Sequence, residues 1–327
     1  MSSLRVLELF GGIGAIRKAL ERNKIDFKVI DYVEIDKFAI KSYNSIYDEN
    51  YEPQDINNWD KDIDVNFIFH GSPCQDFSLA GGGAGGEKQS NTRSSLLWET
   101  LRIVKKLTPK IVMWENVSSV LNKKHKPVVD AYLLELQKLG YQSQLLKLNS
   151  SDYGIPQHRT RIYIVSKLQD APIIITHLPK KLNTTLQDLL EEGVSETFTL
   201  SNQLKRYINS FDKDKKDNGA GKYVVSKTRL VLNRTIASTV STRTGRNRAD
   251  CSDYISNDFG LNENIFGMDL TPYHIRRLTP LECWRLMGFD DETFAKAKEV
   301  CSNTQLYKQA GNSIVVDVLC HILKELL

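Results

Sequence analysis

The first half of the chain alternates short apolar runs with longer stretches in which apolar residues recur every three or four positions. The short runs are rich in β-branched and aromatic residues and bounded by turn formers, so we predict buried strands at 5–10, 27–30, 65–69, 111–114, 145–148 and 162–165. The amphipathic stretches predict helices at 15–23, 95–107 and 128–139. Strands that alternate with helices predict an α/β fold with a mostly parallel sheet.

The pattern changes from about residue 170, where Pro, Lys, Asn and Asp become frequent. We expect a smaller, partly β domain there. Order returns at residue 276, where Thr279 should cap a helix that Pro280 begins. A last helix carries an apolar stripe between residues 314 and 323, which we expect to pack on a sheet. These changes predict a first domain, a second region and a C-terminal segment that returns to the first domain: 1–169, 170–275 and 276–327.

The composition is that of an ordinary soluble protein, with 41% hydrophobic and 26% charged residues. No apolar run reaches the roughly 18 residues of a membrane span, and the start of the sequence shows no signal-peptide pattern, so we expect a cytoplasmic protein without membrane contact. The five cysteines are scattered and include no Cys-x-x-Cys pair, which argues against a disulfide framework and a zinc site.

The net charge of +4 is unevenly distributed. Residues 201–250 hold twelve Lys or Arg against four Asp, a local charge of +8, so the remainder carries −4. A basic segment of this kind fits a polyanionic partner. Taken alone, it is about as typical of a solvated surface loop.

One stretch, Gly71–Ser78, directly follows the predicted strand 65–69 and leads into the glycine run Gly81–Gly86. It places Cys74 in a turn stiffened by Pro73, at a strand end where ligands of open α/β sheets gather. A thiol beside glycine-rich, flexible chain suggests a nucleophile next to a mobile lid. An arbitrary cysteine is more often a small buried hydrophobe, so the neighbouring residues must decide.

The first predicted strand runs into the glycine turn Gly11–Gly14 and then a helix, which is the arrangement of a nucleotide cradle. Glu34 follows about 20 positions later, where this fold holds a ribose. The glycine spacing lacks the full dinucleotide fingerprint, and no phosphate-binding Lys follows, so a nucleoside cofactor without pyrophosphate is favoured. Asp55 and Ile56 would present a carboxylate and an apolar side chain to a purine.

Two further features fall near the same predicted edge. Glu115 directly follows the predicted strand 111–114, so its carboxyl group should lie at the same edge as Cys74. Arg159 and Arg161 are two residues apart on an extended segment, which predicts that both guanidinium groups face one way.

Five short motifs in fixed order resemble those of the DNA cytosine-C5 methyltransferases of the bacterial and phage restriction-modification type. The resemblance covers residues 4–165 and roughly 234–327. Any one motif is weak evidence, but five in order at compatible spacing are strong. They are the segments Phe10–Gly14, Pro73–Gln75, Glu115–Val117, Gln157–Arg161 and Tyr307–Ser313.

The resemblance implies a Rossmann-like fold with S-adenosylmethionine as methyl donor, and no metal. Ile35 stands where the family often has Trp, which weakens stacking on the cofactor. The catalytic residues it implies are Cys74, Glu115, Arg159 and Arg161. The cofactor contacts it implies are Phe10, Gly11, Gly12, Ile13, Gly14, Glu34, Ile35, Asp55, Ile56, Pro73, Leu96, Asn312 and Ser313.

The resemblance also implies a duplex DNA partner whose target cytosine is flipped out of the helix. The second region would recognise the target sequence, and the enzyme would act as a monomer, with a separate cognate restriction endonuclease as a family-level expectation. The DNA contacts we expect are Lys88, Gln89 and Arg93 beside the glycine run, and Arg229, Arg234, Arg243 and Arg246 in the second region.

Three other functions fit parts of the pattern. One branch of the family methylates a transfer RNA, but the Cys-Phe-Thr tripeptide associated with that branch is absent from this sequence. A relative without catalysis would not need the expected catalytic residues, all of which are present. A nicotinamide-dependent oxidoreductase would share the fold but leaves Cys74, Glu115 and Arg159 without a joint purpose.

Overall fold

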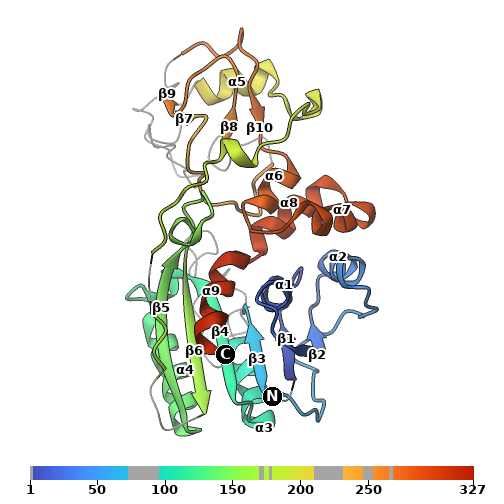
Figure 1. Cartoon of the computed structure of the whole chain (residues 1–327), viewed down its shortest axis with the longest axis vertical. Helices are drawn as coiled ribbons and strands as arrows, with labels where there is room; N and C mark the ends of the chain where they lie inside the picture. Colours follow the sequence, from blue (N-terminus) through green and yellow to red (C-terminus); the bar gives the residue numbers. More distant parts are fainter. Residues whose placement is uncertain are drawn as a thin grey trace, which may run out of the picture. The chain divides into compact units, whose positions relative to one another are not determined.

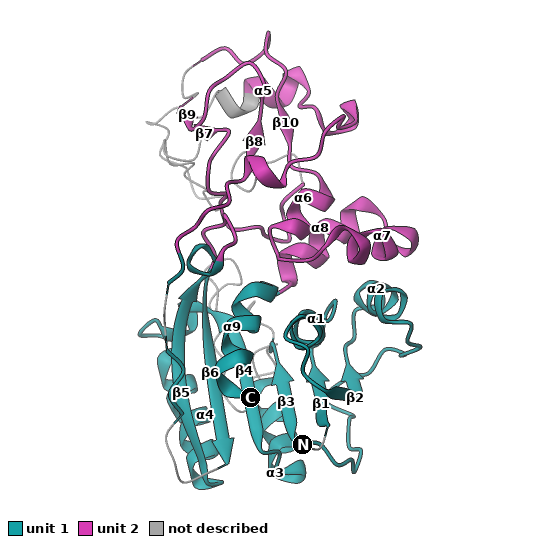
Figure 2. Ribbon diagram, in the orientation of Figure 1, with its two compact units in different colours: residues 1–153, 160–180, 314–327 teal, residues 154–159, 181–313 magenta. Residues whose placement is uncertain are grey.

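The computed structural model describes residues 3–72, 96–168, 173–176, 179–209, 231–245, 253–264 and 268–327. The chain forms two compact units (Figure 2). Unit 1 comprises residues 1–153, 160–180 and 314–327, and unit 2 comprises residues 154–159 and 181–313. We expected the chain to return to the first domain at residue 276, whereas unit 1 takes up the chain again at residue 314.

Unit 1 is built on a six-stranded sheet (Figure 1). Its strands lie in the order β2-β1-β3-β4-β6-β5; the first four are parallel, and β6 runs antiparallel to both of its neighbours. The predicted α/β class is confirmed, and each predicted strand is present. The strands are β1 (Leu4–Leu9), β2 (Phe27–Val33), β3 (Phe67–His70), β4 (Ile111–Val117), β5 (Tyr141–Asn149) and β6 (Thr160–Leu168).

Helices cover both faces of this sheet. The prediction missed α2, which Asp36 caps by accepting from the backbone N–H groups of Phe38 and Ala39. Its buried face includes Ser42 and Tyr43, so the apolar periodicity is weak in the sequence. Figure 1 shows α1 and α9 side by side, and these two helices are in contact. The helices are α1 (Ala15–Arg22), α2 (Lys37–Tyr47), α3 (Leu96–Leu107), α4 (Lys126–Lys138) and α9 (Val316–Leu326), with short 3₁₀ turns at Ser118–Leu121 and Ser150–Tyr153.

Alternation along β1 separates the two faces. Leu7 and Leu9 belong to the main core cluster, together with the apolar faces of α3 and α4. Each such side chain, buried completely, stabilises the fold by roughly 1.5–3 kcal/mol. Glu8 points the other way and is also fully buried, and its carboxyl group accepts from the hydroxyl of Tyr43 on α2 at 3.0 Å. A carboxyl group therefore lies within the layer between the sheet and α2.

The strand order places a switch point between β1 and β3. The chain leaves β1 for β2 on one side and then crosses to β3 on the other side. Ligands of open α/β sheets bind at the carboxyl ends of the strands beside such a point. In this chain those ends are followed by Phe10–Gly14 and by Gly71 and Ser72.

Unit 2 contains a small mixed sheet of four two-residue strands in the order β10-β8-β7-β9. A separate apolar cluster that includes Leu232 and Tyr254 packs around it. The expectation of a smaller, partly β domain is confirmed. Its elements are α5 (Asn202–Asn209), β7 (Val231–Leu232), β8 (Tyr254–Ile255), β9 (Glu263–Asn264), β10 (Arg276–Arg277), α6 (Pro280–Arg285), α7 (Asp291–Val300) and α8 (Asn303–Asn312), with 3₁₀ turns at Gln187–Leu189 and Glu196–Phe198.

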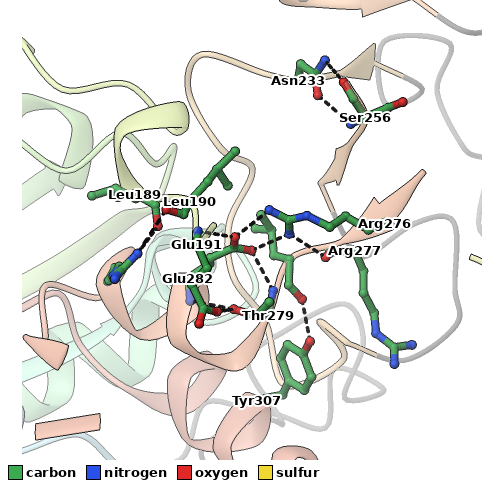
Figure 3. A network of polar contacts seen from close by, with 12 residues as sticks. Leu189, Leu190, Glu191, Asn233, Ser256, Arg276, Arg277, Thr279, Glu282 and Tyr307 are labelled. Atoms are coloured by element: carbon green, nitrogen blue, oxygen red, sulfur yellow. Dashed lines mark hydrogen bonds and ion pairs between the residues drawn. The ribbon is translucent and has the colours of Figure 1, made fainter. Parts of the chain in front are cut away.

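A buried ion pair joins the last strand of this sheet to α6 (Figure 3). Arg276 donates from both terminal nitrogens to the two carboxylate oxygens of Glu282, at 2.8 and 2.9 Å, and Glu282 is fully buried. The same carboxylate accepts from the backbone N–H groups of Thr279 at 2.8 Å and Glu191 at 2.9 Å. Thr279 caps α6 in a capping box, as predicted.

No helix among the described residues is both long enough and apolar enough to cross a membrane.

Glu282→Gln should destabilise unit 2 strongly. The amide keeps the shape of the side chain but leaves the buried Arg276 guanidinium without its charged partner, and breaking a buried pair in this way costs about 3–5 kcal/mol. Urea unfolding monitored by circular dichroism measures the loss. Asp130→Asn is the matched control, because Asp130 pairs with Lys126 at an exposed site and its loss should cost under about 1 kcal/mol. Equal effects of the two variants would contradict the prediction.

Glu8 should make the stability of the protein depend on pH. Burial raises the pKa of Glu8 from 4.5 to about 8, so between these pH values the native state keeps a proton that the unfolded chain has released. Stability should therefore fall as the pH rises from about 5 to 8, by up to about 1.4 kcal/mol per pH unit from this one group. Glu8→Gln should remove that part of the decline when free energies of unfolding are compared across this range. Parallel wild-type and variant profiles would refute the assignment.

Candidate active site and cofactor cradle

Backbone conformation and close packing require glycine in the turn after β1. Gly12 and Gly14 have φ values of +56° and +77°, in the left-handed region that favours glycine. A Cβ on Gly11 would lie 2.6 Å from the ring of Tyr32, and one on Gly14 would lie 2.4 Å from the ring of Tyr47. A Cβ on Gly12 would meet nothing within 4 Å. The turn is packed from below at two glycines and open at the third, as a cradle for a closely approaching ligand requires.

Glu34 lies directly against this turn. Its Oε2 accepts from the backbone N–H of Gly12 at 3.1 Å, and its Oε1 accepts from the N–H groups of Ile35 and Asp36, both at 2.9 Å. Burial raises the pKa of Glu34 above its ordinary value, although these N–H groups oppose the shift. Each carboxylate oxygen has more than one acceptor site, so the group can still accept from ligand hydroxyls.

The loop that carries Asp55 is held beside Glu34. The backbone N–H of Gln54 donates to the carbonyl of Glu34 at 2.8 Å, and Asp31 at the end of β2 accepts from Gln54 and from Trp59. Asp55 itself accepts from the backbone and side chain of Asn57.

The apolar residues expected at the cofactor differ in exposure. Ile56 is 3% exposed and belongs to the main core cluster, so its side chain packs inside unit 1. Ile35, by contrast, is 67% exposed next to Glu34. Phe10 and Leu96 are partly buried against the core, and Ile13 is buried.

Glu115 lies near the end of β4, beside the end of β3. Its Oε1 lies 3.4 Å from Nε of Arg161, which is the second residue of β6. A Cβ built on Gly71 would lie 3.9 Å from its Oε2. Gly71 precedes Cys74 by three residues. The structure thus places a buried carboxyl group and a guanidinium group next to the chain segment that leads to the predicted nucleophile.

A buried hydrogen bond that we did not predict anchors the same segment. The indole N–H of Trp114 donates to the hydroxyl of Ser72 at 2.8 Å, and both residues are buried. The amide of Asn116 reaches the Ser72 carbonyl at 3.5 Å. Strand register aligns His70 with Trp114, and Ser72 follows His70 by two residues. The pair could have been predicted only from a correct register between β3 and β4.

Arg159 and Arg161 take different partners. Arg159 precedes β6, so the strand alternation that we assumed does not extend to it. Its guanidinium donates to three backbone carbonyls of unit 2, those of Val240 at 2.6 Å, Gly311 at 3.1 Å and Ser313 at 2.6 Å. Arg159 is 3% exposed. This side chain is an anchor for loops of unit 2.

The closing motif lies at the end of α8 in unit 2. A Cβ on Gly311 would lie 2.2 Å from the backbone of Ser241, so only glycine fits there. Asn312, the last residue of α8, is exposed, and Ser313 is buried. The motif is therefore held by backbone packing and by Arg159.

Two of the expected DNA contacts, Arg234 and Arg243, lie within the described residues. Arg234 has its Nε 3.3 Å from the buried carboxylate of Asp253, which compensates its charge. Arg243 has its backbone N–H bonded to the hydroxyl of Ser241. Outside the described residues lie Pro73, Cys74, Lys88, Gln89, Arg93, Arg229, Arg246 and the run Gly81–Gly86.

Comparison with known proteins identifies the family. The profile of the C-5 cytosine-specific DNA methylases matches residues 4–327. The type II methyltransferase M2.ScrFI of Lactococcus lactis subsp. cremoris is 34% identical, and the alignment covers 99% of each chain. The type II methyltransferase M.HhaI of Haemophilus parahaemolyticus is 30% identical over 98% of this chain and 94% of that protein.

Solved structures show the same fold. The methyltransferase EhMeth of Entamoeba histolytica superposes with a TM-score of 0.78 at 20% identity, covering 100% of this chain and 98% of that one. The Dnmt2 methyltransferase of S. pombe gives a TM-score of 0.74 at 19% identity with the same coverage. Since the profile spans nearly the whole sequence and the relatives are matched end to end, the chain belongs to the C-5 cytosine-specific DNA methylase family and is a DNA cytosine-5 methyltransferase.

Proposed function

We propose that the enzyme transfers a methyl group from S-adenosylmethionine to carbon 5 of a cytosine flipped out of duplex DNA, through a covalent bond between Cys74 and carbon 6. The observation that carries the proposal is the position of Glu115. Its buried carboxyl group lies beside Gly71, three residues ahead of Cys74, with Arg161 at 3.4 Å. A nucleophile and a proton-bearing group on one pyrimidine ring need this proximity.

The cradle fits a nucleoside better than a pyrophosphate. A phosphate would need backbone N–H donors such as that of Gly12, but Glu34 already accepts from this group. The Glu34 carboxylate would also repel the negative charge of a phosphate. Ribose hydroxyls can instead donate to that carboxylate. The cofactor would supply an electrophilic methyl group on a sulfonium. We expect Gly11, Gly12 and Glu34 to hold its nucleoside, with the exposed Ile35 against the base.

The residues of the chain would overcome the poor nucleophilicity of carbon 5. The Cys74 thiolate adds to carbon 6, which pushes electron density toward carbon 5. Glu115, carrying or sharing a proton at ring nitrogen 3, offsets the negative charge that develops in the ring. Carbon 5 would then take the methyl group, with the sulfur–methyl bond broken and S-adenosylhomocysteine left as the neutral product. Loss of the carbon 5 proton to solvent, with release of Cys74 from carbon 6 and return of the shared proton to Glu115, restores the aromatic ring and the thiolate.

The target base must leave the helix for this reaction, because a stacked cytosine cannot offer its faces to a thiol and a sulfonium. We assign recognition of the flanking sequence to the region 170–275, whose segment 201–250 carries the local charge of +8. The run Gly81–Gly86 with Lys88, Gln89 and Arg93 would close over the extruded nucleotide. Phosphate contacts by Lys88 and Arg93 would position the duplex without reading its sequence.

The contacts of Arg159 favour a positioning role over direct catalysis. Its guanidinium holds the carbonyls of Gly311 and Ser313 on either side of Asn312, and also that of Val240. These residues include the closing motif that we assign to the cofactor. Arg161, which contacts Glu115, is the arginine with a place in the catalytic step.

Cys74→Ala should lower methyl transfer to DNA by about 10³-fold or more, because the ring loses its only route of covalent activation. The assay is tritium transfer from labelled S-adenosylmethionine to unmethylated genomic DNA, with bisulfite sequencing of the product. Cys301→Ala, at the end of α7, is the matched control and should behave as the wild type. Transfer that survives in Cys74→Ala would exclude the adduct, and transfer to transfer RNA but not to duplex DNA would exclude the proposed acceptor.

Glu115→Gln should lower kcat by about 10²- to 10⁴-fold, the usual contribution of a positioned proton donor, while leaving the affinity for S-adenosylmethionine within about twofold. Arg161→Lys should retain more activity than Arg161→Ala, because a cation remains near Glu115. Single-turnover kinetics on a hemimethylated or unmethylated duplex measures the rate of methyl transfer in the Glu115 and Arg161 variants. The surface variant Asp130→Asn is the control, because it also removes one negative charge and should keep the wild-type rate. A Glu115→Gln variant with wild-type kcat would remove Glu115 from the mechanism.

A further inference from the structure

Two tyrosine hydroxyl groups hold the glycine turn from below. The hydroxyl of Tyr32, on β2, donates to the carbonyl of Gly12 at 2.7 Å. The hydroxyl of Tyr47, the last residue of α2, donates to the carbonyl of Gly14 at 2.8 Å. The two rings are the same ones that leave no room for a Cβ on Gly11 and Gly14. Ring and hydroxyl therefore fix the turn together.

The glycine turn needs such support because its own residues provide little. Glycine restricts the backbone less than any other residue, so a turn of three glycines can adopt many conformations. The N–H of Gly12 meets Glu34, and the carbonyl of Gly12 meets Tyr32. Tyr32 and Glu34, the carboxylate assigned to the ribose, thus hold the same residue. Glu34 binds the N–H of Gly12, and Tyr32 binds its carbonyl.

The tyrosines are themselves held by a stack of aromatic rings. The Tyr32 ring stacks on Tyr43 with centroids 3.9 Å apart, and Tyr43 lies 4.7 Å from Tyr47. The guanidinium of Arg17, on α1, lies 4.4 Å from the centre of the Tyr47 ring. The Tyr43 hydroxyl is fixed by Glu8 on β1. Elements β1, β2, α1 and α2 thus converge on two hydroxyl groups.

We propose that Tyr32 and Tyr47 are positioning residues for the cofactor, which fix the carbonyls of Gly12 and Gly14 and so preform the surface that receives the nucleoside. This inference rests on the proposed use of the cradle for S-adenosylmethionine. Preorganisation of a binding surface raises affinity because the ligand does not have to order the loop when it binds. Burial raises the pKa of Tyr32 well above its ordinary value, so its hydroxyl remains a donor.

A role in core packing alone would make a different prediction. Packing needs the rings, whereas positioning needs the hydroxyl groups. Tyrosine to phenylalanine changes therefore separate the two roles, because they keep the ring and remove one hydrogen bond. Tyr141 offers a matched control in the same unit, since its hydroxyl donates to the carbonyl of Pro109 at 2.6 Å. That bond joins β5 to the loop between α3 and β4 and contacts no residue of the glycine turn.

The experiment measures binding of S-adenosylmethionine and S-adenosylhomocysteine by isothermal titration calorimetry for Tyr32→Phe, Tyr47→Phe and Tyr141→Phe. We expect each of the first two to raise both dissociation constants about 3- to 10-fold, the effect of one net hydrogen bond. Tyr141→Phe should bind as the wild type does. Steady-state kinetics should show a higher KM for S-adenosylmethionine in Tyr32→Phe and Tyr47→Phe, with kcat and the KM for DNA unchanged.

Unchanged cofactor affinity in both folded variants would overturn the inference, and so would an equal loss in Tyr141→Phe. Thermal unfolding confirms that each variant is folded. Tyr32 is completely buried, and if that variant does not fold, the partly buried Tyr47 provides the test by itself. Failure of the proposed function is distinguishable, because the wild-type protein would then bind neither ligand. A wild-type protein that binds and transfers methyl groups, with variants equal to it, contradicts the inference alone.

Discussion

The parallel pairing of β1 with β3, and of β3 with β4, is the constraint on which the site depends. These strands are buried on both faces, and apart from Glu8 the polar groups of the proposed site lie near or beyond the strand ends. Register then decides which ends meet. His70 lies opposite Trp114, which puts Gly71 and Ser72 beside Glu115 and Asn116. The segment that leads to Cys74 is thereby placed next to the carboxyl group assigned to the base.

The two carboxylates at this edge, Glu34 and Glu115, have different surroundings. Glu34 is surrounded by three backbone N–H groups and stands over the glycine turn, so it remains an acceptor for neutral hydroxyl donors. Glu115 faces the guanidinium of Arg161 instead. In the proposed function, Glu34 would serve the sugar of the cofactor and Glu115 the target pyrimidine. The tyrosine hydroxyls below the glycine turn hold the carbonyls of Gly12 and Gly14 beside Glu34.

Three arginines have structural partners, and one of them, Arg234, was expected to contact DNA. Arg159 holds three carbonyls, Arg276 pairs with the buried Glu282, and Arg234 faces the buried Asp253. A buried guanidinium is retained where its charge is matched by carboxylates or carbonyls around it. Since Arg234 is one of the twelve cations of residues 201–250, the positive charge of that segment overstates the number of cations that its surface offers to a phosphate backbone.

The sequence by itself determined the α/β class, the strands and most helices of unit 1, the Thr279 cap and the order of the motifs, because these follow from local periodicity and turn chemistry. It did not reveal α2, whose buried face contains Ser42 and Tyr43, nor the partners of Arg159, which come from residues about 80 and 150 positions away. The hydrogen bonds of Trp114, Tyr32 and Tyr47 also depend on tertiary packing. Local sequence sets which elements form, whereas the choice of partner for a buried polar group depends on which distant element is brought against it.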